Sequence, residues 1–259
     1  DLFVNDAFAV AHRTAASTVG VAKILPSFAG ELLCAEVENI SRIMENPARP
    51  LLAIVGGAKV SSKIGVLKTL CKLADTVIVG GAIGTTFNYA CGAAVGNSLY
   101  EPDMAATARE IMDVAAAHNC KFLMPIDKGV GATFEKTAKR VNKSLDEITD
   151  ADVIIDDGPM TAGRNIDEIN HAATVIWNGT FGMAEWGAVW GKASFALAQD
   201  LAHLTKMGRI RSIVGGGETV AALDAIDVHK DMTYVSTGGG AFLEFIEGKE
   251  LPGIKALEK

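Results

Sequence analysis

The chain has 259 residues, of which 49% are hydrophobic and 21% charged, and its formal net charge is −7. Such a composition is typical of a globular protein with enough apolar material for one large domain or two smaller ones. The acidic balance argues against a general binder of nucleic acids or anionic membranes, which carries basic patches, but it is compatible with small phosphorylated ligands that need only a few local cations.

Short apolar runs rich in valine and isoleucine predict β-strands along the whole chain. They lie at residues 2–5, 51–55, 76–79, 121–125, 153–155, 174–177, 212–214 and 233–236. Helical spacing predicts helices at residues 28–46, 61–74, 103–119, with Asp103 as N-cap, and 194–204. Apolar strands that alternate with helices imply a parallel sheet buried on both faces. The predicted fold class is therefore α/β, a three-layer sandwich with a parallel, Rossmann-like sheet covered by helices on both faces.

Residues 76–100 carry no charge, and the segment is long enough to suggest a membrane span. Its five glycines, two asparagines and three threonines favour a strand, a glycine turn and a buried helix instead.

The sequence contains no signal peptide and begins without methionine inside an apolar pattern, so we expect a piece of a longer protein. The four cysteines lack metal-binding spacing and predict reduced, mostly buried thiols in a cytoplasmic protein without a structural zinc site.

Four segments share one pattern, an apolar run followed by a glycine cluster and a helix start. They are AIVGGAKVSSKIGVL (53–67), VIVGGAIGTTF (77–87), RSIVGGGETVAALDAI (211–226) and YVSTGGGAFLEFI (234–246). Ligands of open parallel sheets bind beyond the carboxyl ends of the strands, where backbone N–H groups and helix dipoles attract phosphate. A single such turn is equally well explained by tight packing, but four favour a nucleotide site. The chain lacks the P-loop motif and the G-x-G-x-x-G fingerprint, which argues against a P-loop enzyme and a dinucleotide-binding dehydrogenase.

Six ordered motifs carry a resemblance that covers essentially the whole chain. They are GGAKVSSK, VIVGGAIGTTF, DDGPMT, VIWNGTFGMAE, VGGGETVAA and STGGGAFLEFIEGKELPG, preceded by NDAFAVAHRTAAST. In this order they are similar to the motifs of phosphoglycerate kinases. The resemblance implies reversible phosphoryl transfer between 1,3-bisphosphoglycerate and Mg-ADP, giving 3-phosphoglycerate and ATP without a covalent intermediate. Such chemistry asks the protein mainly to position substrates and neutralise charge.

The resemblance also divides the chain. Residues 1–27 correspond to the tail end of an N-terminal, phosphoglycerate-binding domain, and residues 28–50 to a connecting helix. Residues 51–252 correspond to the nucleotide-binding C-terminal domain, and residues 253–259 to a tail that returns toward the N-terminal domain. Because most of the N-terminal domain is absent from the sequence, we expect a fragment that binds nucleotide with little turnover, from a protein that is monomeric when complete.

For the nucleotide, the resemblance implies roles for residues in the glycine turns. Lys63 is the catalytic, phosphate-binding lysine and Lys59 a second contact; solvated helix lysines are the alternative. Glu185 binds the ribose hydroxyls, with an ordinary surface glutamate as the alternative. The other implied nucleotide contacts are Gly80, Gly81, Asn178, Gly179, Gly216, Gly217, Glu218 and Thr219. We expect Trp177 in the core.

Glu218 is the implied magnesium contact, at a position where the family has aspartate. Magnesium prefers oxygen ligands at about 2.0–2.1 Å in near-octahedral geometry, so the extra methylene shifts the metal or leaves its contact water-mediated. Ala9, Thr180 and Lys192 also depart from the family pattern. A second hypothesis is therefore a non-catalytic nucleotide-binding paralogue with an altered metal site.

The second glycine triplet is implied to act on the phosphoryl group in transit, through the N–H groups of Thr237 and of Gly238, Gly239 and Gly240. His12 and Arg13 match contacts to the phosphoglycerate; two exposed loop residues are the alternative reading. Asp127 and Asp157 are expected to secure turns, and residues 146–152 to form a solvated acidic loop.

Overall fold

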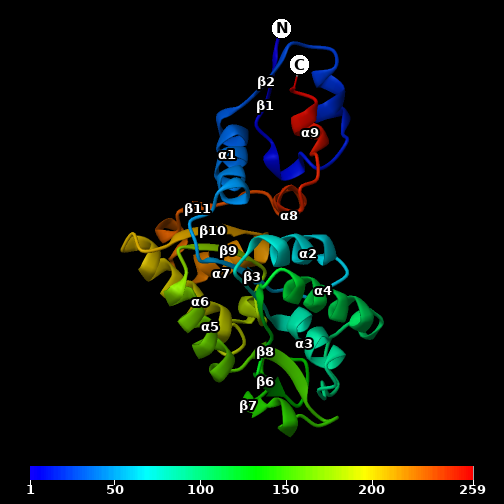
Figure 1. Ribbon diagram of the computed structural model, residues 1–259, viewed down its shortest axis with the longest axis vertical. Coiled ribbons are helices and arrows are strands. Elements are labelled where there is room, and N and C mark those ends of the chain that lie inside the picture. The colour runs from blue at the N-terminus through cyan, green and yellow to red at the C-terminus, as the bar shows by residue number, and fades with distance from the viewer. Residues whose placement is uncertain (259) are drawn as a thin grey trace.

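A six-stranded parallel sheet forms the centre of the computed structural model, which describes residues 1–258 (Figure 1). The strand order is β11-β10-β9-β3-β4-β5, and every neighbouring pair is parallel. The strands are β3 (Leu51–Val55), β4 (Thr76–Val79), β5 (Lys121–Leu123), β9 (Thr174–Asn178), β10 (Arg211–Gly215) and β11 (Tyr234–Val235). Strands β3 and β9 are buried throughout, as expected at the centre of a covered sheet. The predicted parallel sheet is confirmed.

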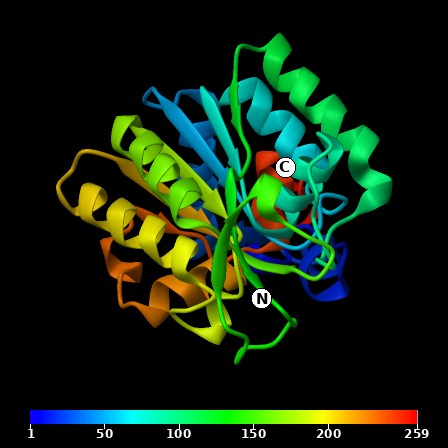
Figure 2. The ribbon, with the colours of Figure 1, turned by 90° about the horizontal axis from the view of Figure 1, so that it is seen from below.

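Helices cover both faces of this sheet, as Figure 2 shows end-on. One group consists of α2 (Ile64–Leu73), α3 (Gly81–Ala90), α4 (Ala105–Ala117) and α8 (Gly240–Ile246), and the other of α5 (Pro159–His171), α6 (Lys192–Lys206) and α7 (Gly217–Ala225). Successive residues of a strand point to opposite faces of the sheet. In β3, Ala53 packs in the core under the first group of helices, and Ile54 packs in the core under the second group. The predicted three-layer sandwich is therefore confirmed.

A separate antiparallel sheet follows β5 and lies at the end of the molecule opposite the termini (Figure 1). It consists of β6 (Asp127–Gly131), β7 (Val141–Ser144) and β8 (Val153–Asp157), in the order β7-β6-β8. The run at 153–155 is a strand, as predicted, but it pairs here with β6 and not in the parallel sheet. Strands β6 and β7 have no valine- and isoleucine-rich run and are not predicted by the sequence.

The first residues and the last described ones lie together beyond helix α1 (Glu31–Glu45) (Figure 1). Strand β1 (Phe3–Asn5) pairs in parallel with β2 (Ser27–Ala29), and α9 (Pro252–Lys255) lies against this segment. The Asn5 side chain donates to the Gly253 carbonyl at 3.3 Å. The helix predicted from residue 28 begins only at Glu31, because 27–29 pair with β1. Of the expected tail 253–259, residue 259 lies outside the described part.

Three other local predictions need correction. Helix α2 begins at Ile64, so Lys59 lies in the preceding loop. Asp103 lies in a 3-10 turn (Pro102–Met104), and α4 starts after Met104 without a side-chain cap. In the acidic segment 146–152, Asp152 is buried and paired with Lys143 at 2.8 Å.

The uncharged segment 76–100 forms a strand, a glycine turn and a buried helix, as predicted. Within residues 1–258 no helix combines the length and the apolar composition that a membrane crossing requires. The cysteine prediction holds only for Cys71 and Cys120, since Cys34 and Cys91 are exposed.

Candidate functional site

The glycine turns after β3 and β9 pack backbone against backbone at the carboxyl edge of the sheet. A Cβ added to Gly56 would lie 2.3 Å from the Thr180 carbonyl oxygen and 2.5 Å from that of Gly179. Gly179 itself has φ +93°, a region that favours glycine. The Gly57 N–H donates to the Thr180 carbonyl at 3.0 Å. The close approach of the two turns therefore requires glycine at positions 56 and 179, whether or not a ligand is bound.

Lys63 reaches from the start of α2 into this junction. Its Nζ donates to the Gly56 carbonyl and to Asn178 Oδ1, both at 2.6 Å. Burial lowers the pKa of Lys63 to about 8, and the nearby Glu218 carboxylate opposes the shift. The ammonium group is thus fixed beside the ends of β3 and β9, in surroundings that disfavour its charge unless an anion is close.

Asn178 and Thr219 connect the glycine turn after β10 to the packed turns after β3 and β9. Asn178 Nδ2 donates to the Gly215 carbonyl at 2.7 Å, and Thr219 Oγ1 accepts the Gly179 N–H at 2.7 Å. Both side chains are buried. Helix α7 begins immediately after Gly216, whose φ is +99°. The positive end of this helix therefore lies beside the turns that hold Lys63.

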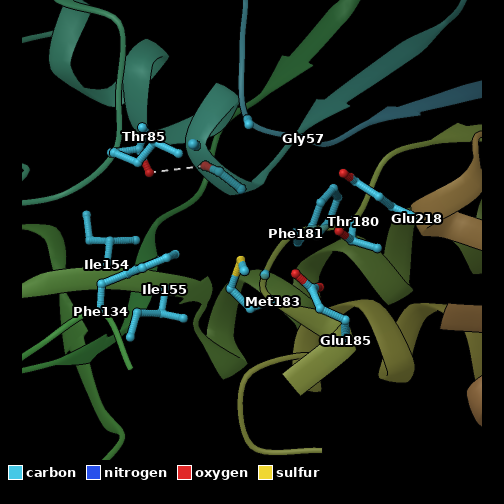
Figure 3. A pocket seen from close by; sticks show the side chains of 15 residues that line it. Gly57, Thr85, Phe134, Ile154, Ile155, Thr180, Phe181, Met183, Glu185 and Glu218 are labelled. Atoms are coloured by element: carbon cyan, nitrogen blue, oxygen red, sulfur yellow. Dashed lines mark hydrogen bonds between the residues drawn. The ribbon is translucent and has the colours of Figure 1, made fainter. Parts of the chain in front are cut away.

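A cavity of about 280 Å³ lies next to these turns (Figure 3). One end is mostly apolar, with Thr85, Phe134, Ile154 and Ile155, and the other carries the Glu185 and Glu218 carboxylates. Its complete lining is Gly57, Ala58, Gly81, Ala82, Thr85, Leu99, Phe134, Ile154, Ile155, Thr180, Phe181, Gly182, Met183, Glu185 and Glu218. The two glutamates also border a neighbouring cavity of about 640 Å³.

The structure gathers most of the predicted nucleotide residues around this cavity. Those that line it are Gly81, Glu185 and Glu218. Behind or beside its walls lie Lys63, Gly80, Asn178, Gly179, Gly216 and Thr219. Lys59 is exposed in the loop before α2. Gly217 is also exposed, and a Cβ added there would meet no protein atom within 4 Å. Trp177 is fully buried in the core, as predicted.

A second group of predicted residues lies apart from the cavity, at the start of α8. A Cβ on Gly240 would lie 3.1 Å from His12 Nε2, and one on Gly238 would lie 2.6 Å from the Phe8 ring. The exposed Arg13 donates through Nε to His12 Nε2 at 3.4 Å. The segment that contains His12 and Arg13 therefore contacts the second glycine triplet.

Two N–H groups of that triplet region already have protein acceptors. The N–H and the hydroxyl of Thr237 both donate to Glu36 Oε1 at 2.7 Å, and the Gly238 N–H donates to Ser236 Oγ at 3.1 Å. Glu36 belongs to α1 and is completely buried. The structure thus differs from the expectation that Thr237 and Gly238 present free N–H groups. A Cβ at Gly239 would meet no protein atom within 4 Å.

Sequence reasoning missed the apolar wall and a buried carboxyl, Asp156, that lies against the cavity-lining Gly182. Phe134 and Ile154 come from different parts of the antiparallel sheet segment, and no motif joins them. Asp156 accepts from Arg140 Nη1 at 2.6 Å and from the Ala193 N–H at 3.2 Å. Burial raises the pKa of Asp156 to about 7, against the pull of Arg140. This carboxyl links β8 to the start of α6, just after the loop that carries Glu185.

The donor set fits a magnesium ion carried by a nucleotide better than an ion held by protein alone. Among residues 1–258 no three His, Cys, Asp or Glu side chains come close enough to hold a metal. Nucleotide-bound magnesium keeps several waters and takes one or two carboxylates besides phosphate oxygens. The exposed Glu218 carboxylate, which lines the cavity, can supply that kind of contact.

Comparison with known proteins decides the family. The sequence model described as phosphoglycerate kinase matches residues 1–249. The chain belongs to the phosphoglycerate kinase family. The phosphoglycerate kinase of Azorhizobium caulinodans is 45% identical over all 259 residues, and that of Xanthobacter autotrophicus 44%.

Solved structures of phosphoglycerate kinases agree with this assignment. The one from Coxiella burnetii has a TM-score of 0.91 and 45% identity, and the one from Pyrococcus horikoshii a TM-score of 0.85 and 29% identity. Each comparison covers 99% of this chain, and 65% and 64% of the other chain, respectively. The chain likewise spans 65% of the length of the two curated relatives.

Proposed function

We propose that this chain is the nucleotide-binding portion of a phosphoglycerate kinase. In the proposed reaction, a phosphoryl group passes reversibly between 1,3-bisphosphoglycerate and Mg-ADP, giving 3-phosphoglycerate and ATP in the cytoplasm. The observation that carries the proposal is the cavity beside three packed glycine turns, with Lys63 and the start of α7 at its edge. Parallel sheets of this kind bind their ligands at the carboxyl edge of the strands.

The two ends of the cavity suit the two ends of a nucleotide. The base would lie at the end formed by Phe134, Ile154 and Ile155, and Glu185 would accept hydrogen bonds from the ribose hydroxyls. The phosphates would lie toward Lys63 and the N-terminus of α7, where an ammonium group and backbone N–H groups favour negative charge. Lys59, Gly80, Gly216 and Gly217 would complete this end.

Glu218 would hold the magnesium ion together with the nucleotide phosphates. When bound, the ion neutralises phosphate charge and orients the phosphoryl group. His12, Arg13 and the second glycine triplet would form one edge of the phosphoglycerate site, with Gly239 as the triplet residue that packing leaves open. Because the chain spans about two thirds of its relatives, we propose that it binds nucleotide with little turnover by itself, and that the complete protein is a monomer.

Calorimetric titration with ADP, with and without magnesium, tests the proposal directly. We expect micromolar-range binding that magnesium strengthens. In Glu218→Gln the magnesium effect should disappear, because the ion loses its carboxylate contact, while magnesium-free binding should persist through Lys63 and the glycine turns. Glu45→Gln, an exposed change at the end of α1, serves as the matched control and should behave like the parent chain.

The remaining outcomes separate the alternatives. ADP binding that is indifferent to magnesium in the parent chain would favour the non-catalytic paralogue, and binding of NAD instead of ADP would favour a dehydrogenase. Absence of any nucleotide binding by a folded chain would contradict the proposal. Turnover close to that of a complete kinase, in a coupled assay of this chain, would refute the expected dependence on the rest of the protein.

A further inference from the structure

A buried ion pair lies behind one wall of the cavity. Lys128 Nζ in β6 and Asp157 Oδ1 at the end of β8 are 2.7 Å apart, and both side chains are 0% exposed. Neither side chain is part of the cavity lining. Burial raises the pKa of Asp157, and Lys128 opposes that shift. Charges buried in this way destabilise the fold unless further hydrogen bonds complete their surroundings, so their other partners indicate what the pair does.

Those partners close a ring of hydrogen bonds on Gly81. Asp157 Oδ2 accepts the Gly81 N–H at 3.2 Å, and Lys128 Nζ donates to Thr85 Oγ1 at 3.3 Å. Thr85 Oγ1 in turn donates to the Gly81 carbonyl at 3.1 Å, the bond drawn from Thr85 in Figure 3. The ion pair therefore fixes the Gly81 N–H directly and the Gly81 carbonyl through the Thr85 hydroxyl.

The first turn of α3 is placed by this ring. Gly81 begins α3 with φ +64°, and a Cβ there would lie 3.1 Å from the Thr180 carbonyl oxygen across the cavity wall. Gly81 and Thr85 both line the cavity. Glycine adopts this φ without strain, and hydrogen bonds to charged groups are stronger than those between neutral groups, so the pair fixes the orientation of this first turn.

We propose that Lys128 and Asp157 are positioning residues of the nucleotide site, which keep the Gly81–Thr85 wall in its binding conformation. The proposal rests on the nucleotide function proposed above. The two residues touch no ligand; they act through Gly81 and Thr85, by removing the cost of ordering the wall when nucleotide binds. Their effect should be largest at the Thr85 end of the cavity, where the base would lie, because Lys63 at the phosphate end is held separately by Gly56 and Asn178.

The test uses a double substitution that removes both charges together. Lys128→Met with Asp157→Leu leaves no unpaired buried charge, and replacing a buried pair by apolar residues of similar volume often preserves stability. We expect the Kd for ADP to rise about tenfold. The reason is that the Gly81 N–H and the Thr85 hydroxyl lose their charged partners, so the wall is no longer fixed before ADP binds. The Kd for pyrophosphate, which occupies only the phosphate end, should rise clearly less than that for ADP, and the melting temperature should shift by no more than a few degrees.

Two further variants serve as partial rescue and control. Lys128→Met with Asp157→Asn returns an acceptor to the Gly81 N–H but leaves Thr85 without its lysine, so ADP binding should weaken by only about threefold. Lys143→Met with Asp152→Asn removes another ion pair of the same sheet segment, neither residue of which lines the cavity, and should leave ADP binding unchanged. If the Met/Leu variant does not fold, the Met/Asn variant carries the test.

Each outcome separates this inference from the proposed function. If the parent chain binds ADP and both Lys128/Asp157 variants bind it equally well, the positioning role is wrong while the nucleotide site stands. Equal weakening toward ADP and pyrophosphate would mean a general loss of structure and would also overturn it. If the folded parent chain binds neither ligand, the proposed function fails first.

Discussion

Lys63 is the side chain whose protonation bears most directly on phosphate binding. Burial lowers its pKa to about 8, so the free chain holds it charged at pH 7 and largely neutral at pH 9. If only the charged form binds phosphate, the Kd for ADP rises about tenfold between these pH values, in proportion to the lost competent fraction. Titration calorimetry at pH 7, 8 and 9 measures this change.

Lys63→Met is the matching control at the same residue. It removes a charge-assisted hydrogen bond, so ADP should bind roughly 10- to 100-fold more weakly at pH 7. Its affinity should then vary little from pH 7 to 9. A parent chain whose ADP affinity is constant over this range would show that Lys63 does not act as the phosphate ligand.

At the scale of single elements, two glycines give opposite predictions: Gly56 in the turn after β3, and Gly217 at the first position of α7. In Gly56→Ala the new Cβ would collide with the backbone at Thr180 and Gly179. We expect a loss of about 1–3 kcal/mol in the free energy of unfolding, the usual cost of overpacking. Chemical denaturation measures this loss, and an unchanged midpoint would mean that the two turns can separate easily.

Gly217→Ala should spare stability and weaken nucleotide binding. The added Cβ meets no protein atom within 4 Å, and Gly217 is the first residue of α7. Stability should stay constant or rise by up to about 1 kcal/mol, because alanine has less freedom to lose on folding. If phosphates approach this turn, the Cβ intrudes on them and the Kd for ADP rises severalfold. Unchanged ADP binding would place the phosphates elsewhere.

The elements also show which features a sequence can predict. Strands β3, β4, β9 and β10 are recognisable because each is an apolar run, and three of them end in a glycine cluster. Strands β6 (DKGVG) and β7 (VNKS) are held in place by pairing with their neighbours in the folded chain, and no local pattern reveals them. The cavity's apolar wall is hidden for the same reason, since Thr85, Phe134 and Ile154 meet only in the folded chain. The glycines and Lys63 were predictable because their motifs are contiguous.

For the whole molecule, Asp156 predicts how stability depends on pH. Its folded pKa of about 7 lies above the value of about 3.9 in an unfolded chain, because burial favours the neutral acid. Its stabilising contribution is therefore complete below about pH 4 and is lost as the pH rises through 7. Between pH 5 and 8 this one group should lower the free energy of unfolding by on the order of 2 kcal/mol.

Urea unfolding at four pH values from 5 to 8 tests this prediction against Asp156→Asn. The variant should be less stable throughout, because its amide offers a single acceptor oxygen to the Arg140, Asp157 and Ala193 N–H donors that Asp156 accepts with two. Its stability should lack the decline seen in the parent chain over this range. Parallel pH profiles for the two proteins would show that Asp156 keeps an ordinary pKa in the folded state.

The order of strands in the central sheet has a consequence for synthesis and folding. Strand β3 pairs on one side with β4, which follows it closely, and on the other with β9, where Leu51 lies opposite Thr174. During translation, β3, β4 and β5 therefore leave the ribosome long before the partner that covers the open edge of β3. Distant pairings of this kind slow folding, and an unpaired apolar edge invites association between nascent chains. Refolding of this chain should accordingly be slow and should lose yield as protein concentration rises.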